Sequence, residues 1–106
     1  MNSVIEKEVL AEFKNIAKPM MDMGIYDSTR EFVRDVTRDF IRHKIETYKI
    51  KLKDFEQKYH MTFTEFSKKL KKGASIAEED EWMEWEATKN MFKAWKLAAK
   101  ETGLIA

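Results

Sequence analysis

Arginines at a helical spacing are the residues of this sequence best suited to bind a ligand. They recur every four positions, at Arg30, Arg34, Arg38 and Arg42. On a helix this spacing places them in one stripe, where guanidinium groups can contact successive phosphates of a nucleic-acid backbone. Acidic residues form a neighbouring stripe at Glu31, Asp35 and Asp39, and i,i+3 ion pairs are worth only about 0.2–0.5 kcal/mol each. Two interpretations remain open: a phosphate-contacting stripe and a solvated face whose charges pair with one another.

Aromatic residues near the C-terminus form a second candidate group. The segment E-E-D-E-W-M-E-W-E surrounds two tryptophans with acids, and the full stripe comprises Trp82, Trp85, Phe92 and Trp95. Large aromatic side chains supply core packing, and they are also favoured anchors of protein interfaces. The stripe therefore predicts either a helix buried in the core or an acidic aromatic surface for a basic partner.

Catalytic and metal-binding chemistry has little support. The chain contains no cysteine, which excludes disulfides and thiolate chemistry. Its two histidines, His43 and His60, lie far apart, and His43 stands between Arg42 and Lys44, whose charges disfavour a bound cation. The chain lacks a glycine-rich phosphate loop and a nucleophile elbow. The acidic run from Glu78 is typical of a solvated helix start. We expect no enzyme activity, no metal and no cofactor.

Composition and charge indicate a single helical domain of 106 residues. Only three glycines and one proline are present, and 37% of the residues are charged. The net charge of +1 conceals a basic middle, residues 27–73, and an acidic final third. No apolar run approaches the length of a membrane span, and Glu6 and Glu8 occupy the place where a signal peptide needs an apolar core. We expect a cytoplasmic protein that does not enter a membrane.

The apolar periodicity predicts an all-α fold with four helices, at about residues 4–18, 28–59, 62–72 and 77–102. Pro19 is expected to end or kink the first helix, and Gly24 to close any further turn. Ser28 and Glu31 form a capping box that opens the long second helix, and Thr62 and Glu65 form another. The first half, residues 1–60, is a candidate for dimerisation and DNA binding, and residues 61–106 for partner binding.

Around Gly24 the chain resembles the ribbon-helix-helix family, in particular its antitoxin branch. The segment G-I-Y-D-S-T-R-E-F-V-R matches the family at Gly24, Tyr26, Ser28, Glu31, Phe32, Val33 and Arg34. The resemblance implies an intertwined dimer whose paired N-terminal strands read DNA, here reduced to a strand stub at Val4 and Ile5. It also implies a phosphate contact at the start of the second helix. Further along, K-Y-H-M-T-F-T-E-F and the tryptophan segment resemble the C-terminal halves of small prokaryotic antitoxin-like proteins.

These observations lead to one hypothesis and one alternative. The hypothesis is a dimeric antitoxin-like protein of a toxin-antitoxin pair, which neutralises a toxin through the aromatic stripe and also represses its own operon. The dimer would form through Phe32, Val33, Val36 and Phe40, and operator phosphates would be bound by Ser28, Thr29, Arg30, Arg34 and Arg38. The alternative is a helical self-association or scaffold module with neither a toxin nor a nucleic-acid partner.

Overall fold

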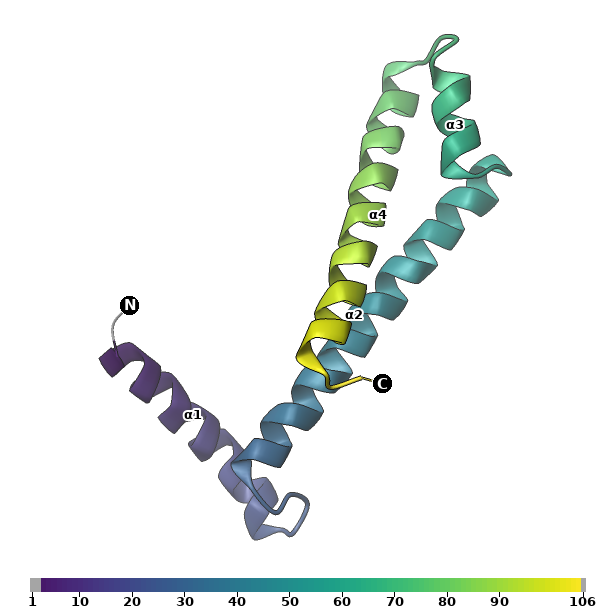
Figure 1. Ribbon diagram of the computed structural model, residues 1–106. Coiled ribbons are helices and arrows are strands. Elements are labelled where there is room, and N and C mark those ends of the chain that lie inside the picture. Colours follow the sequence, from purple (N-terminus) through teal and green to yellow (C-terminus); the bar gives the residue numbers. More distant parts are fainter. Residues whose placement is uncertain (1–2, 106) are drawn as a thin grey trace. The chain divides into compact units, whose positions relative to one another are not determined.

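The computed structural model describes residues 3–105, and within this range the chain is all-α. It forms α1 (Ser3–Asp22), α2 (Thr29–Tyr59), α3 (Phe63–Leu70) and α4 (Ile76–Thr102), as Figure 1 shows. The predicted fold class is thus confirmed. No strand occurs between residues 3 and 105, and Val4 and Ile5 belong to α1. The expected strand stub is therefore absent at these two positions, whereas Met1 and Asn2 lie outside the described residues.

The first helix is longer than the sequence predicted. It continues through Pro19 to Asp22, whereas we expected an end near Lys18. A proline inside a helix removes the bond that its missing N–H would make to the residue four positions earlier, here Asn15. The bonds that follow are intact, because the N–H of Met23 donates to the carbonyl of Pro19 at 3.0 Å. Gly24 then leaves the helix with φ of +77°, a conformation that glycine adopts without a Cβ clash.

Local capping signals set the starts of the two C-terminal helices. Thr62 accepts a hydrogen bond from the N–H of Glu65 while the Glu65 side chain accepts from the N–H of Thr62, and this capping box opens α3. Ser75 and Glu78 make the same reciprocal pair at the start of α4. The last of the three glycines, Gly103, closes α4 in the left-handed region, with φ of +66°.

The chain divides into two compact units, and the boundary lies inside α2. The first unit ends at Asp39 and the second begins at Phe40. The first unit therefore contains α1, the turn after it and the start of α2. The second contains the rest of α2 together with α3 and α4. The sequence suggested a division between two functional halves at residue 60, about twenty residues after this boundary.

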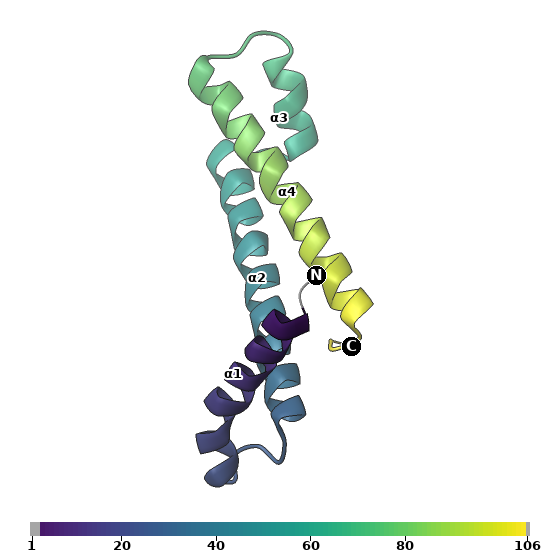
Figure 2. The same cartoon turned by 90° about the vertical axis from the view of Figure 1, so that its left-hand side faces the viewer.

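In the second unit the core is built around one tryptophan. The Trp85 side chain is 1% exposed, and its ring lies parallel to that of Phe55 with 5.2 Å between centroids. Two rings from α3 complete the cluster, because the centroids of Phe66 and Phe63 lie 5.4 Å and 5.5 Å from that of Trp85. Figure 2 shows the result, with α4 beside the second half of α2 and α3 against the start of α4.

The core of the first unit is small. Ala17 of α1 is fully buried and Phe32 of α2 is 8% exposed. Tyr26, in the turn between the helices, packs the edge of its ring against Phe32 with 5.6 Å between centroids. These contacts lie at the C-terminal end of α1, and most of that helix remains outside them.

Candidate interaction surfaces

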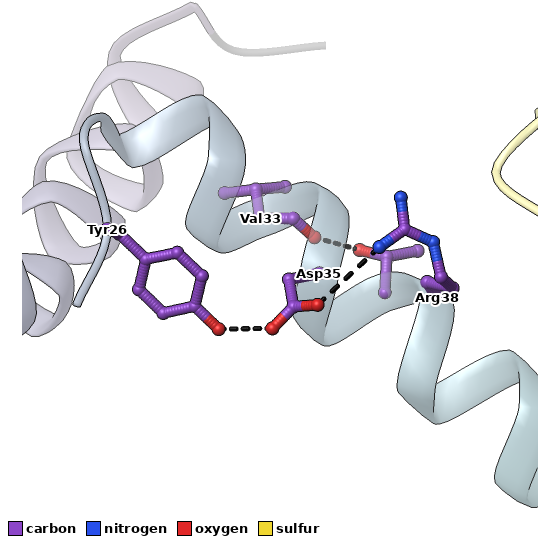
Figure 3. A network of polar contacts seen from close by, with 5 residues as sticks. Tyr26, Val33, Asp35 and Arg38 are labelled. Atoms are coloured by element: carbon purple, nitrogen blue, oxygen red, sulfur yellow. Dashed lines mark hydrogen bonds and ion pairs between the residues drawn. The ribbon is translucent and has the colours of Figure 1, made fainter.

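Side-chain hydrogen bonds hold the turn between α1 and α2. Ser28 accepts from the N–H of Glu31 at 3.2 Å, and the Glu31 carboxylate accepts from the N–H of Asp27 at 3.3 Å. The hydroxyl of Tyr26 donates to the carboxylate of Asp35, as Figure 3 shows. This bond and the nearby negative charges of Asp35 and Asp39 raise the pKa of Tyr26 above its ordinary value of 10.0.

A shallow polar hollow of about 350 Å³ lies beside this turn. It is lined by Ile25, Tyr26, Glu31, Arg34, Asp35 and Arg38. Arg38 contacts Asp35 with 3.5 Å between its guanidinium nitrogen and the carboxylate oxygen (Figure 3). The carboxylates of Glu31 and Asp35 balance the charges of the two arginines in the lining. The hollow therefore offers an incoming phosphate no net positive charge.

The other residues predicted to bind DNA differ in whether they already have a partner within the chain. Ser28 is occupied as the helix cap, and the Thr29 hydroxyl lies 3.9 Å from the sulfur of Met21. Arg30 and Arg34 make no ion pair with any residue from 3 to 105. The stripe is thus partly self-paired and partly unpaired, and DNA binding stays a prediction.

The predicted dimerisation residues divide into buried and exposed members. Phe32 is 8% exposed and belongs to the core of the first unit, so its ring is already in use. Val33 is half-buried. Val36 and Phe40 are 47% and 52% exposed, although the Phe40 ring also packs edge-on against Trp95 at 5.6 Å. Val36 and the open side of Phe40 are the two members available to another chain.

The aromatic stripe of α4 belongs mainly to the core. Trp85 is buried, and Trp82 is half-buried with its indole N–H donating to the hydroxyl of Ser67 at 2.7 Å. Phe92 and Trp95 are also half-buried. One open edge remains at Trp82, where an apolar hollow of about 380 Å³ is lined by Ser67, Leu70, Lys71, Glu79, Trp82 and Met83. As a surface for a partner the stripe is reduced to this edge and the sides of Phe92 and Trp95.

The most exposed apolar surface of the first unit lies on α1. Its members share the 3.6-residue period of one helix face, and they are 40–61% exposed: Ile5, Val9, Leu10, Phe13 and Ile16. We call these five residues the α1 face. The sequence showed this stripe as an ordinary amphipathic pattern, which predicts burial. Only the structure shows that burial of α1 is confined to Ala17 and that the α1 face is left open.

Charges around the α1 face are unevenly distributed. By helical period, Glu6 lies within the apolar stripe, between Phe13 and Leu10, and Glu12 lies at its edge, whereas Lys7 and Lys18 lie towards the opposite side. Lys18 is bonded to Asp22 at 2.8 Å, which raises the pKa of its ammonium group. The apolar stripe therefore includes one carboxylate and has a second at its edge.

Residues 3–105 contain no group of three or more His, Asp or Glu side chains placed to hold a metal ion. None of the helices in this part of the chain is long and apolar enough to cross a membrane.

Comparison with known proteins places the chain in no family. No family model matches it, and neither the curated proteins nor the solved structures contain a match.

Proposed function

We propose that this protein is an antitoxin-like protein that neutralises a toxin by protein–protein binding, and that the α1 face is the surface that the toxin covers. One observation carries the proposal, namely that five large apolar side chains of one helix face are 40–61% exposed. Contiguous apolar surface of this kind marks an interaction site on a soluble protein. The resemblance around Gly24 supplies the class of protein.

The shape of the surface favours a groove as its counterpart. α1 is an amphipathic helix of 20 residues, held at its C-terminal end by Ala17 and the turn that follows. Ile5, Val9 and Phe13 are spaced four residues apart, and Ile16 follows at three. This is the spacing with which an amphipathic helix inserts its apolar side into a hydrophobic groove of another protein.

The charges on α1 indicate which side chains the groove of the partner should present. Because Glu6 lies within the α1 face and Glu12 at its edge, the complement of this face is an apolar groove that also presents basic side chains. A toxin that acts on nucleic acid needs a basic surface to bind its substrate phosphates. A helix that fills such a groove would exclude the substrate, and this is the proposed mechanism of neutralisation.

We assign to the α1 face the leading role in binding that the sequence analysis assigned to the tryptophans. Trp85 is 1% exposed and its ring is in contact with rings from α2 and α3, so no partner reaches it without unfolding the second unit. The exposed edge at Trp82 offers a smaller secondary contact.

Binding to the product of the adjacent gene tests the proposal. We expect a complex on gel filtration and a dissociation constant that rises at least tenfold in Leu10→Glu and Phe13→Glu, because each change buries a carboxylate in an apolar groove. Asn15→Glu is the matched control, since it adds the same charge to an exposed position of the same helix away from the α1 face. Failure of wild type to bind, or equal binding by all three variants, would refute the proposal.

A further inference from the structure

The outward side of α4 carries an apolar pattern that no core contact uses. The buried residues of α4 are Trp85, Thr88 and Ala99, and they lie on one side of the helix. On the other side, Ile76, Met83 and Leu97 are 80%, 62% and 58% exposed. Smaller exposed residues fill the spaces between them, and the set that we call the α4 outer face is Ile76, Met83, Ala87, Asn90, Ala94 and Leu97. The same spacing places an exposed acid at each end of this set, Asp80 and Glu101.

The residues of this face follow a seven-residue repeat. Ile76, Met83, Asn90 and Leu97 are seven positions apart, and Ala87 and Ala94 each stand four positions after a member of that series. Such a 4-3 spacing is the pattern of a two-stranded coiled coil, in which the seam of one helix packs against the seam of another. Because both alanines are small, they permit close approach of a second helix at the middle of the seam.

A line of charges with the same period runs along one edge of the α4 outer face. Its members are two acids followed by two bases, Glu79, Glu86, Lys93 and Lys100. All four are exposed, and none makes an ion pair with any residue from 3 to 105. The helix dipole favours acids in the first turn of a helix and bases in the last turn, but its effect on side-chain charges does not extend beyond these terminal turns. Glu86 and Lys93 lie in the middle of α4, so the dipole does not account for them.

We propose that the α4 outer face pairs in antiparallel orientation with the same face of a second copy of this chain. When Ala87 of one copy faces Asn90 of the other, Met83 faces Ala94, and the acids Asp80 and Glu101 face Leu97 and Ile76 at the ends of the seam. The same alignment sets Glu86 beside Lys93 and Glu79 beside Lys100, with each contact made twice because of the two-fold symmetry. A parallel pair would instead place this line of charges opposite the other edge of the partner, where Glu79 would face Glu84 and neither Lys93 nor Glu86 would meet an opposite charge.

The expected association is weak and depends on concentration. From Ile76 to Leu97 the seam extends about 32 Å at ~1.5 Å per residue. Its central side chains are small, so it buries less than the roughly 800 Å² per partner of a standard interface. This interface does not use the α1 face, and it does not depend on the proposed toxin binding there; it shares Glu79 and Met83 with the hollow beside Trp82.

Charge exchange tests the pairing by sedimentation velocity over a range of protein concentrations. Lys93→Glu with Lys100→Glu makes the edge wholly acidic, and Glu79→Lys with Glu86→Lys makes it wholly basic. We expect each double variant alone to dissociate at least tenfold more readily than wild type, and an equimolar mixture of the two to associate again. Lys49→Glu with Lys53→Glu is the control, because it makes the same change in charge on exposed residues of α2. Loss of association in the control as well, or no recovery in the mixture, would overturn the proposal.

Disulfide trapping tests the orientation, and the chain has no cysteine of its own to interfere. Met83→Cys and Ala94→Cys variants, mixed and oxidised, should form a crosslinked heterodimer because these positions face each other in the antiparallel pair. Each variant oxidised alone should crosslink far less. Self-crosslinking of Met83→Cys in preference to the mixed product, or no crosslink in either case, would contradict the antiparallel pair.

Discussion

The hydroxyl of Tyr26 donates a hydrogen bond to the carboxylate of Asp35, and so joins the turn after α1 to the second turn of α2. Asp35 also contacts Arg38 through its other oxygen, at 3.5 Å. The aromatic ring of Tyr26 meanwhile packs against Phe32. The Tyr26 side chain thus belongs both to the small core of the first unit and to the polar network beside it. The pKa of its hydroxyl therefore reports on the structure of that unit.

We predict that Asp35→Asn lowers the pKa of Tyr26. The bond to the carboxylate and the charge of Asp35 both favour the neutral phenol, so removal of the charge makes ionisation easier. Because the folded pKa of Tyr26 is raised, its contribution to stability is present below the unfolded pKa of 10.0 and is lost as pH rises through the folded value. Ultraviolet titration near 295 nm, with Tyr26→Phe to identify the Tyr26 signal among the three tyrosines, measures the shift. An unchanged Tyr26 signal in Asp35→Asn would show that the bond does not form in solution.

A second prediction separates the core role of the tryptophans from a role in binding. Trp85→Ala should lower the free energy of unfolding by about 3–5 kcal/mol, because it removes a fully buried ring and leaves a cavity. Met83→Ala, on the open side of the same helix, should change it by less than about 0.5 kcal/mol. Urea denaturation followed by circular dichroism measures both. Equal losses in the two variants would mean that the ring cluster around Trp85 is not the core of this unit.

The start of α4 provides a prediction about pH. Hydrogen bonds from the N–H and hydroxyl of Ser75 hold the pKa of Glu78 below its ordinary value of 4.5. A lowered folded pKa means that Glu78 stabilises the fold above about pH 4.5 and that this contribution is lost as pH falls through the folded pKa.

Glu78→Gln retains the capping hydrogen bonds but has no carboxyl group that titrates. The difference in unfolding free energy between wild type and Glu78→Gln should therefore shrink as pH falls from 7 to 3. Glu79→Gln, one residue further along and outside the cap, is the control. A difference that stays constant over this range would exclude Glu78 as the titrating group.

Those features of the fold that depend on near neighbours in sequence were predictable. The capping boxes at Thr62 and Ser75 involve residues three positions apart, so the starts of α3 and α4 follow from local chemistry. The sequence left open whether Pro19 ends or kinks α1, because the proline rule describes a cost and does not show what offsets it. Here the bonds after Pro19 and the burial of Ala17 favour continuation.

The placement of candidate surfaces was less predictable, since it depends on contacts between residues distant in sequence. Trp82 and Trp85 stand in the same acidic segment, yet only Trp85 lies among rings of both α2 and α3. The stripe of α1 has the same pattern as a buried stripe, and its exposure follows from the lack of an element that covers it in the first unit. Periodicity shows which residues share a face, but it does not show whether another element of the chain packs there.

The last prediction concerns Pro19. Because α1 is continuous through this residue, Pro19→Ala should restore the bond from the N–H of residue 19 to the carbonyl of Asn15 and remove the clash that proline causes in a helix. The cost of a proline relative to alanine inside a helix is about 3 kcal/mol, and an exposed position that already accommodates the ring should regain about 1–3 kcal/mol. Amide hydrogen exchange reports the change by site, and we expect slower exchange in α1 around residues 16–22, with α3 and α4 unaffected. Ala11→Gly, at an exposed position earlier in α1, is the opposite control and should speed exchange in the same helix by removing helix propensity. Faster exchange in Pro19→Ala would show that α1 ends before Pro19 in solution.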